Sequence, residues 1–174
     1  QALVQNNEQN WVHLSQDNIN NGRTGKREDV EKAVKQALTS NNKKQSVVID
    51  RMHLDETQRA HFIQLAKDAK VPAHAVVLSP PKEIVAERVR ERDNHEGGVQ
   101  GDSGAKLAKT SSDKLQTPKY AEGLALISAS STNEGAAKIV GFYRKVSSST
   151  NGDTADTTIM PTSFPLSKDV ALPS

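Results

Sequence analysis

Two short apolar runs in this sequence are each followed by a carboxylate. Asp17 comes three residues after Val12-His13-Leu14, and Asp50 directly follows Val47-Val48-Ile49. In parallel α/β sheets, ligands bind beyond the carboxyl ends of the strands, so both carboxylates are candidates for such a site. A carboxylate there can hold Mg²⁺ beside nucleotide phosphates, directly or through water. Asp at a strand end is also a common helix cap or turn former, and that interpretation stays open.

Arg88 and Arg92 form a second candidate group. They are four residues apart in a helical pattern, so both guanidinium groups could reach one anion. The interleaved acids Glu87, Glu91 and Asp93 favour a simpler interpretation, a solvated face with ion pairs. The glycines that follow, at 97, 98, 101 and 104, suit a closing lid, although a plain surface loop has the same composition.

The usual phosphate cradle is missing from the sequence. A P-loop requires Gly-x-x-x-x-Gly-Lys-Ser/Thr, whose backbone N–H groups and lysine surround the phosphates. Residues 22–27 and 101–106 contain glycine and lysine but have the wrong spacing. The spacing of the five histidines does not match that of metal ligands. His95 is the one candidate for a functional role, because it lies beside the glycine-rich segment.

Short apolar runs alternate with helical patterns through most of the chain. Strands are expected at residues 12–14, 46–49, 73–78 and 124–127, and helices at about 30–38, 55–69, 81–89 and 133–145. Capping boxes, Asp55 with Gln58 and Ser131 with Glu134, open the second and fourth helices. Residues 47–49 and 75–78 are continuously apolar, which is typical of strands buried on both faces. The pattern predicts an α/β fold with a doubly wound parallel sheet and helices on both of its faces.

Composition limits the possible functions. The 174 residues carry a formal net charge of +2, a 34% hydrophobic share and no cysteine. These values exclude a strongly basic tail, a disulfide framework and thiolate chemistry. No apolar run is long enough to cross a membrane, and a soluble intracellular protein is expected. We expect a folded domain over residues 1–145 and a disordered tail or linker over 146–174, which is rich in Ser, Thr and Pro.

Five motifs in order resemble one known family. They are Trp11-x-x-x-Ser15-Gln16-Asp17, Val47-Val48-Ile49-Asp50-Arg51, Ala73-x-Ala75-Val76-Val77-Leu78, Arg88-x-x-x-Arg92-x-x-His95-Glu96-Gly97 and Leu115-x-x-Pro118-x-x-x-Glu122-Gly123. Together they resemble the polynucleotide-kinase-like P-loop domain, of the AAA-type ATPase or kinase class, in plant-type aprataxin-like DNA repair proteins. The resemblance extends from about Trp11 to Lys145.

The resemblance implies a role for each candidate residue. Asp17 would be the general base that accepts a proton from a 5′-hydroxyl group, and Asp50 would lie near the metal and the phosphates. Arg88 and Arg92 would be lid arginines that contact ATP and stabilise the transferred phosphoryl group. Asn20 stands where the family has a basic contact to the substrate strand, and Arg59 is a further candidate for substrate binding.

The resemblance also implies a missing part. The chain lacks the first strand and the P-loop, and Gln1-Ala2-Leu3-Val4 resembles the middle of the helix that follows the P-loop. We therefore expect a fragment that is inactive by itself, derived from a parent enzyme that uses ATP and Mg²⁺.

The expected partners are nucleic acid 5′ ends, with DNA favoured over RNA, and a following hydrolase domain, with no membrane; nuclear localisation is implied by the resemblance alone. Two alternatives remain: a noncatalytic nucleic-acid-binding module that assists a neighbouring hydrolase, and a small-molecule kinase of the same fold.

Overall fold

The computed structural model describes residues 11–17, 19–21, 23–40, 45–93, 95 and 97–149. Its strands are β1 (Trp11–Ser15), β2 (Ser46–Asp50), β3 (His74–Leu78) and β4 (Leu126–Ser130). Its helices are α1 (Arg27–Thr39), α2 (Glu56–Asp68), α3 (Lys82–Arg90), α4 (Gly101–Asp113) and α5 (Asn133–Ser149), with a 3₁₀ turn, η1, at Tyr120–Glu122. The mixed α/β class is therefore confirmed.

The strands form two parallel pairs. β1 pairs with β2, with Ser15 opposite Asp50, and β3 pairs with β4, with Leu78 opposite Ser130. No strand among the described residues joins β2 to β3, so the continuous, doubly wound sheet expected from the sequence is not seen here. Helix α1 links β1 to β2, and helices α3 and α4 with η1 link β3 to β4; such helical crossovers are the connection that parallel pairing requires.

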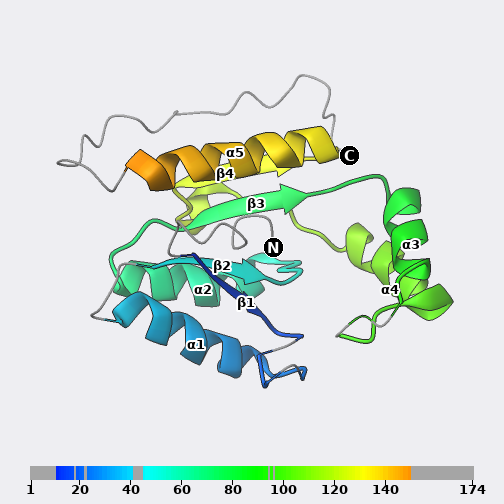
Figure 1. The fold of residues 1–174 in the computed structure, drawn as a ribbon, viewed down its shortest axis with the longest axis horizontal. Coiled ribbons are helices and arrows are strands. Elements are labelled where there is room, and N and C mark those ends of the chain that lie inside the picture. The colour runs from blue at the N-terminus through cyan, green and yellow to red at the C-terminus, as the bar shows by residue number, and fades with distance from the viewer. Residues whose placement is uncertain are drawn as a thin grey trace.

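Each strand pair has its own small core. Val30 and Val34 of α1 pack with Phe62 of α2 against β1 and β2. Ile139 and Tyr143 of α5 pack with Leu126 of β4. Figure 1 shows α5 lying over β3 and β4, while α1 and α2 accompany β1 and β2. The apolar faces of α1 and α2 thus hold the β1–β2 pair, and the apolar face of α5 holds the β3–β4 pair.

The continuous apolar strands are less buried than predicted. Val76 and Leu78 of β3 are 46% and 60% exposed, and neither end of β2 is buried. Val76 and Leu78 are two residues apart and therefore lie on the same face of β3, which the structure leaves largely exposed. The prediction of burial on both faces was wrong for the structure as it stands.

Helix boundaries show which capping signals operate. Asp55 accepts a hydrogen bond from the Gln58 backbone at 2.8 Å, and Gln58 accepts one from the Leu54 backbone at 3.2 Å. The predicted start of α2 is confirmed. At α5 the operative cap is Thr132, whose Oγ1 accepts from the Gly135 backbone at 3.1 Å, so the predicted cap at Ser131 was one residue early.

Two other boundaries differ from the prediction. The glycines at 97, 98, 101 and 104 predict a lid or a surface loop, whereas helix α4 begins at Gly101 and buries Gly104 and Ala105. Helix α5 continues to Ser149, past the expected domain end at residue 145. Most of the predicted tail, from residue 150 onward, lies outside the described residues.

Candidate functional site

The carboxyl ends of β1 and β2 bring the two predicted carboxylates to one edge of the fold. Ser15 ends β1 directly opposite Asp50, which ends β2. Asp17 lies in the turn two residues later, and its backbone N–H donates to Ser15 Oγ at 3.2 Å. Parallel pairing alone therefore places Asp17 and Asp50 at the same end of the strands, as the sequence predicted.

Asp50 is the more open of the two carboxylates. Its side chain is 68% exposed, and Oδ2 lies 3.2 Å from Nε2 of His13 on the neighbouring strand. The imidazole fixes the orientation of one carboxylate oxygen and leaves the other facing solvent. Asp50 therefore keeps an oxygen free for a cation or a water molecule.

Asp17 faces the loop between α3 and α4. The Cα of Gly97 approaches so closely that an ideal Cβ on it would lie 2.6 Å from Asp17 Cγ. Both residues are half-buried. The structure thus brings the predicted base and the glycine-rich segment together, although they are about eighty positions apart in the sequence.

The predicted lid arginines stand at different places. Arg88 is in the last turn of α3 and donates through Nη2 to Asn133 Oδ1 at 3.4 Å, at the start of α5. Arg92 lies past Arg90, where α3 ends, so the two guanidinium groups do not share one helix face as the spacing predicted. Arg92 is exposed, and no hydrogen bond or ion pair holds it within the part of the chain that the structure describes.

Helices α3 and α4 form a hairpin beyond the strand ends (Figure 1). Ion pairs tie it together, Lys82 with Asp113 and Arg90 with Asp102. A shallow hollow of about 440 Å³ is lined by Arg90, Asp102, Ser103, Ala105, Lys106 and Lys109. Three cations against one carboxylate make this hollow positive, which suits an anionic ligand.

Asn20 is exposed in the connection between β1 and α1. Its backbone N–H and C=O exchange hydrogen bonds with Arg23, and its amide donates to Asp29 Oδ2 at 3.4 Å. Asp29 caps α1 through the Lys26 backbone at 2.7 Å, and this hydrogen bond lowers the pKa of its carboxyl group. Asn20 is therefore part of a turn that fixes the start of α1, with its backbone already paired.

Arg59 has a placement that conflicts with its predicted role as a substrate contact. It is 6% exposed, and its Nε and Nη2 donate to the two carboxylate oxygens of Glu122 at 2.7 and 2.8 Å. Its Nη1 donates to the carbonyls of His53 and Gln116 at 3.1 and 2.9 Å. The ion pair raises the pKa of Arg59 and lowers that of Glu122. With its donors engaged inside the protein, Arg59 joins α2 to η1 instead of contacting a nucleic acid.

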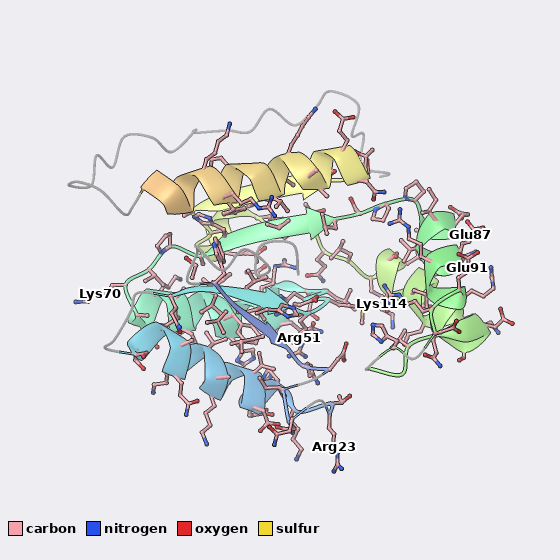
Figure 2. All side chains as sticks on the ribbon, viewed as in Figure 1. Arg23, Arg51, Lys70, Glu87, Glu91 and Lys114 are labelled. Atoms are coloured by element: carbon pink, nitrogen blue, oxygen red, sulfur yellow. The ribbon has the colours of Figure 1, made fainter. Side chains whose placement is uncertain are left out.

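Arg51 is a candidate that sequence reasoning missed. It follows Asp50 and lies beside the β1–β2 pair (Figure 2), and its buried Nη1 atom has no hydrogen-bond partner. His53, two residues after Arg51, adopts a positive φ of 45°, and burial together with the nearby Arg51 and Arg59 charges lowers its pKa to about 4. The only sequence signal was the position of Arg51 directly after a strand-end carboxylate.

The described residues meet the needs of a nucleotide and Mg²⁺ only in part. No group of three His, Cys, Asp or Glu side chains that could hold a metal occurs among them. Mg²⁺ beside phosphates usually needs only one or two carboxylates, which Asp50 could supply. The chain offers cations for phosphates at Arg88 and Arg92 but no Gly-rich cradle with its lysine.

These features define a class of protein: a mixed α/β domain whose polar site lies beyond the strand ends, under a helical hairpin. A model of the family described as "AAA domain" matches residues 1–111, more than half of the chain. The chain therefore belongs to this AAA domain family and is a P-loop kinase-like domain. Such domains generally use ATP and Mg²⁺.

A curated relative also matches. The chain is 32% identical over 136 residues to "Transcription factor bHLH140" of Arabidopsis thaliana. The match covers 78% of this chain and 14% of the relative, so the chain corresponds to a small part of that protein. No helix among the described residues is both long and apolar enough to cross a membrane.

Proposed function

We propose that this chain is part of an ATP-dependent kinase that phosphorylates 5′-hydroxyl groups of nucleic acids, in a protein linked to DNA strand-break repair. The observation that carries the proposal is the meeting of Asp17, at the end of β1, with Gly97 of the α3–α4 loop. Within the AAA domain family, a carboxylate covered by a helical hairpin at the strand ends suits phosphoryl transfer.

In the proposed reaction the acceptor hydroxyl attacks the γ-phosphorus of ATP. A new P–O bond forms to the acceptor, the bond to the ADP oxygen breaks, and the hydroxyl proton goes to Asp17. Bound Mg²⁺ would neutralise charge on the phosphates, with Asp50 as the carboxylate nearest to it. Arg88 and Arg92 would compensate the charge on the transferred group, because phosphoryl transfer depends mainly on positioning and electrostatic stabilisation.

We further propose that a strand and a P-loop preceding Gln1 complete the domain, and that the 174 residues alone are inactive. The open edges of β2 and β3 support this, because each of these strands pairs with only one strand within the described ranges. An added parallel strand would satisfy both edges and bring backbone N–H groups to the end where Asp17 and Asp50 lie.

The choice of a nucleic acid as the phosphate acceptor is supported by the positive charge of the α3–α4 hollow. The positive hollow on the α3–α4 hairpin, with Lys106 and Lys109, favours an acceptor that carries several phosphates over a neutral small molecule. The noncatalytic alternative would use Arg59 and the Arg88–Arg92 segment as phosphate contacts; because Arg59 is buried against Glu122, that alternative now depends on the Arg88–Arg92 segment. Nuclear localisation follows only if the repair role holds.

The test restores the upstream sequence from the gene and measures transfer of labelled phosphate from ATP to 5′-hydroxyl oligonucleotides. We expect transfer with the restored protein, none with residues 1–174 alone, and a loss on the order of 10²–10⁴-fold for Asp17→Asn, as for removal of a general base.

Asp68→Asn, on the solvent-exposed end of α2 away from the site, is the matched control and should retain full activity. Transfer that is unaffected by Asp17→Asn would contradict the catalytic assignment. Transfer to nucleosides or sugars in preference to oligonucleotides would favour the small-molecule alternative.

A further inference from the structure

The connection from β1 to α1 is closed by hydrogen bonds between its two ends. The Gly25 backbone N–H donates to the Gln16 carbonyl at 2.8 Å, and the Gln16 side-chain amide donates through Nε2 to the Gly25 carbonyl at 3.0 Å. Gln16 thus uses a backbone acceptor and a side-chain donor on one residue, nine positions further along the chain. Asp17 directly follows Gln16, so the closed end of this connection carries the predicted base.

Gly25 is buried, and the space around it is filled. A Cβ added there would clash with Ile19 Cγ2 and would lie 2.9 Å from Asp29 Oδ2. Ile19 in turn packs against the core of the β1–β2 half. The Gln16 amide therefore closes the connection against a residue whose own position is fixed by packing.

The peptide group between Gln16 and Asp17 is held at both of its polar atoms. Its carbonyl, from Gln16, accepts the Gly25 N–H, and its N–H, from Asp17, donates to Ser15 Oγ at 3.2 Å. Ser15 is 7% exposed at the end of β1. Because a peptide group is planar, these two bonds fix the direction in which the chain enters Asp17.

We infer that Gln16 is a positioning residue, which holds the Asp17 carboxylate in place for proton transfer by closing the β1–α1 connection onto Gly25. The inference rests on the proposed function, in which Asp17 receives the acceptor proton. The Gln16 amide is engaged with Gly25, so Gln16 acts through Asp17 and not on the acceptor. A general base must lie within hydrogen-bond reach of its proton, and a displacement of Asp17 therefore slows transfer without weakening the binding of ATP.

The closure can be tested in the 174-residue chain without any activity. Gln16→Met keeps the length and the neutral charge of the side chain but removes the amide donor. Gln36→Met, at an exposed position of α1, is the matched control. NMR spectroscopy measures the rate at which the Gly25 N–H exchanges with deuterium.

We expect slow exchange of the Gly25 N–H in the wild-type chain, because this group is buried and hydrogen-bonded. Gln16→Met should speed the exchange at least about tenfold, and Gln36→Met should leave it unchanged. Free exchange in the wild-type chain, or an unchanged rate in Gln16→Met, would mean that the Gln16 side chain does not close the connection. Either result would overturn the inference.

The catalytic consequence is tested in the protein with its upstream sequence restored. We expect Gln16→Met to lower kcat for transfer to a 5′-hydroxyl oligonucleotide about tenfold or more and to leave the KM for ATP within about twofold. Gln36→Met should change neither. The substitution is then repeated in Asp17→Asn, which has no base left to position. There Gln16→Met should lower the residual transfer by less than about twofold, because residues that act as a unit are not additive.

An equal loss in the two backgrounds would show that Gln16 supports the fold independently of Asp17, and the positioning role would be overturned. If the restored protein shows no kinase activity at all, the proposed function fails, and the catalytic role of Gln16 fails with it. The exchange of Gly25 still decides in that case whether Gln16 closes the connection. The two failures are thus distinguishable.

Discussion

At the scale of single residues, charged side chains have different roles according to whether they are buried in the interior or exposed at the candidate site. Arg59 and Glu122 form a bidentate pair with side chains 7% and 3% exposed. Asp50, by contrast, has an exposed carboxylate whose ion-pair partner among the described residues is His13. A buried pair stabilises the fold only when both partners are present, while an exposed carboxylate remains available to a ligand. The same residue types therefore carry different roles in this protein.

Glu122→Gln should destabilise the chain by about 3–5 kcal/mol, because it leaves the Arg59 charge buried without its carboxylate. Urea unfolding followed by circular dichroism measures the change. Glu134→Gln, which removes a carboxylate from an exposed pair with Lys138, is the matched control and should have little effect. Comparable losses in the two variants would contradict the structural role assigned to Arg59.

His53 should make the fold sensitive to acid. Its pKa falls from the ordinary value of 6.5 to about 4 in the folded protein, mainly because burial disfavours the charged imidazole. The unfolded chain therefore takes up a proton first as the pH falls, and stability decreases between about pH 6.5 and pH 4. Burial lowers the pKa of His74 as well, and its contribution has the same sign.

His53→Asn should flatten this dependence, because Asn tolerates the positive φ of this position and does not titrate. The measurement is the free energy of unfolding against pH from 8 to 4. The loss relative to wild type should be constant above about pH 7, where the imidazole is neutral in both states, and should shrink toward pH 4. Parallel curves down to pH 4 would refute the assigned pKa direction.

At the scale of elements, local hydrogen bonds decide where helices begin. Ser131 and Thr132 are both suitable caps by residue type, yet only Thr132 Oγ1 receives the Gly135 N–H. Ser130 Oγ accepts a hydrogen bond from the Thr132 backbone N–H and donates one to the Thr132 carbonyl. These two bonds place Thr132, and not Ser131, at the start of α5. The hydrogen bonds at the end of β4 therefore decide which of the two candidate residues caps α5.

Thr132→Ala should cost about 1 kcal/mol of stability, the usual loss for a helix cap, and Ser131→Ala should cost less than about 0.5 kcal/mol. Urea midpoints of the two variants, with an unchanged slope, provide the comparison. A larger loss for Ser131→Ala would restore the cap predicted from the sequence.

At the scale of the whole molecule, the two strand pairs are halves of an incomplete framework. Each half has a small core, Val30, Val34 and Phe62 on one side and Leu126, Ile139 and Tyr143 on the other. Val76 and Leu78 of β3 are 46% and 60% exposed, and β3 pairs with no described strand other than β4. An additional strand paired with β2 and β3 would join the two halves into one sheet and bring its own apolar side chains beside theirs.

Restoring the upstream strand should raise both the urea midpoint and the slope of unfolding, because the slope grows with the surface buried on folding. The control is the same extension with the apolar strand residues replaced by Ser and Gly. Identical slopes for the two extended proteins would show that the strand does not enter the sheet.

The sequence by itself determined the element types and the strand-end carboxylates. Alternating apolar runs and helical periods are local properties, and they located the strands and four of the five α-helices that the structure describes, but not the pairing of the strands. Helix α4 was not predicted, because its glycines and serines suggest a loop and its buried face exists only against α3. The hydrophobic pattern of the α4 segment alone does not indicate its contact with α3.

Tertiary structure decided which residues meet. The sequence could place Asp17 after a strand and Gly97 in a flexible segment, but only folding brings the Asp17 carboxylate against the Gly97 Cα. The same holds for Arg59, whose positive charge suggested a ligand contact until Glu122, 63 positions away, proved to be its partner. Periodicity is set by neighbours along the chain, whereas burial and pairing depend on residues distant in sequence, and these decide the chemistry available to each side chain.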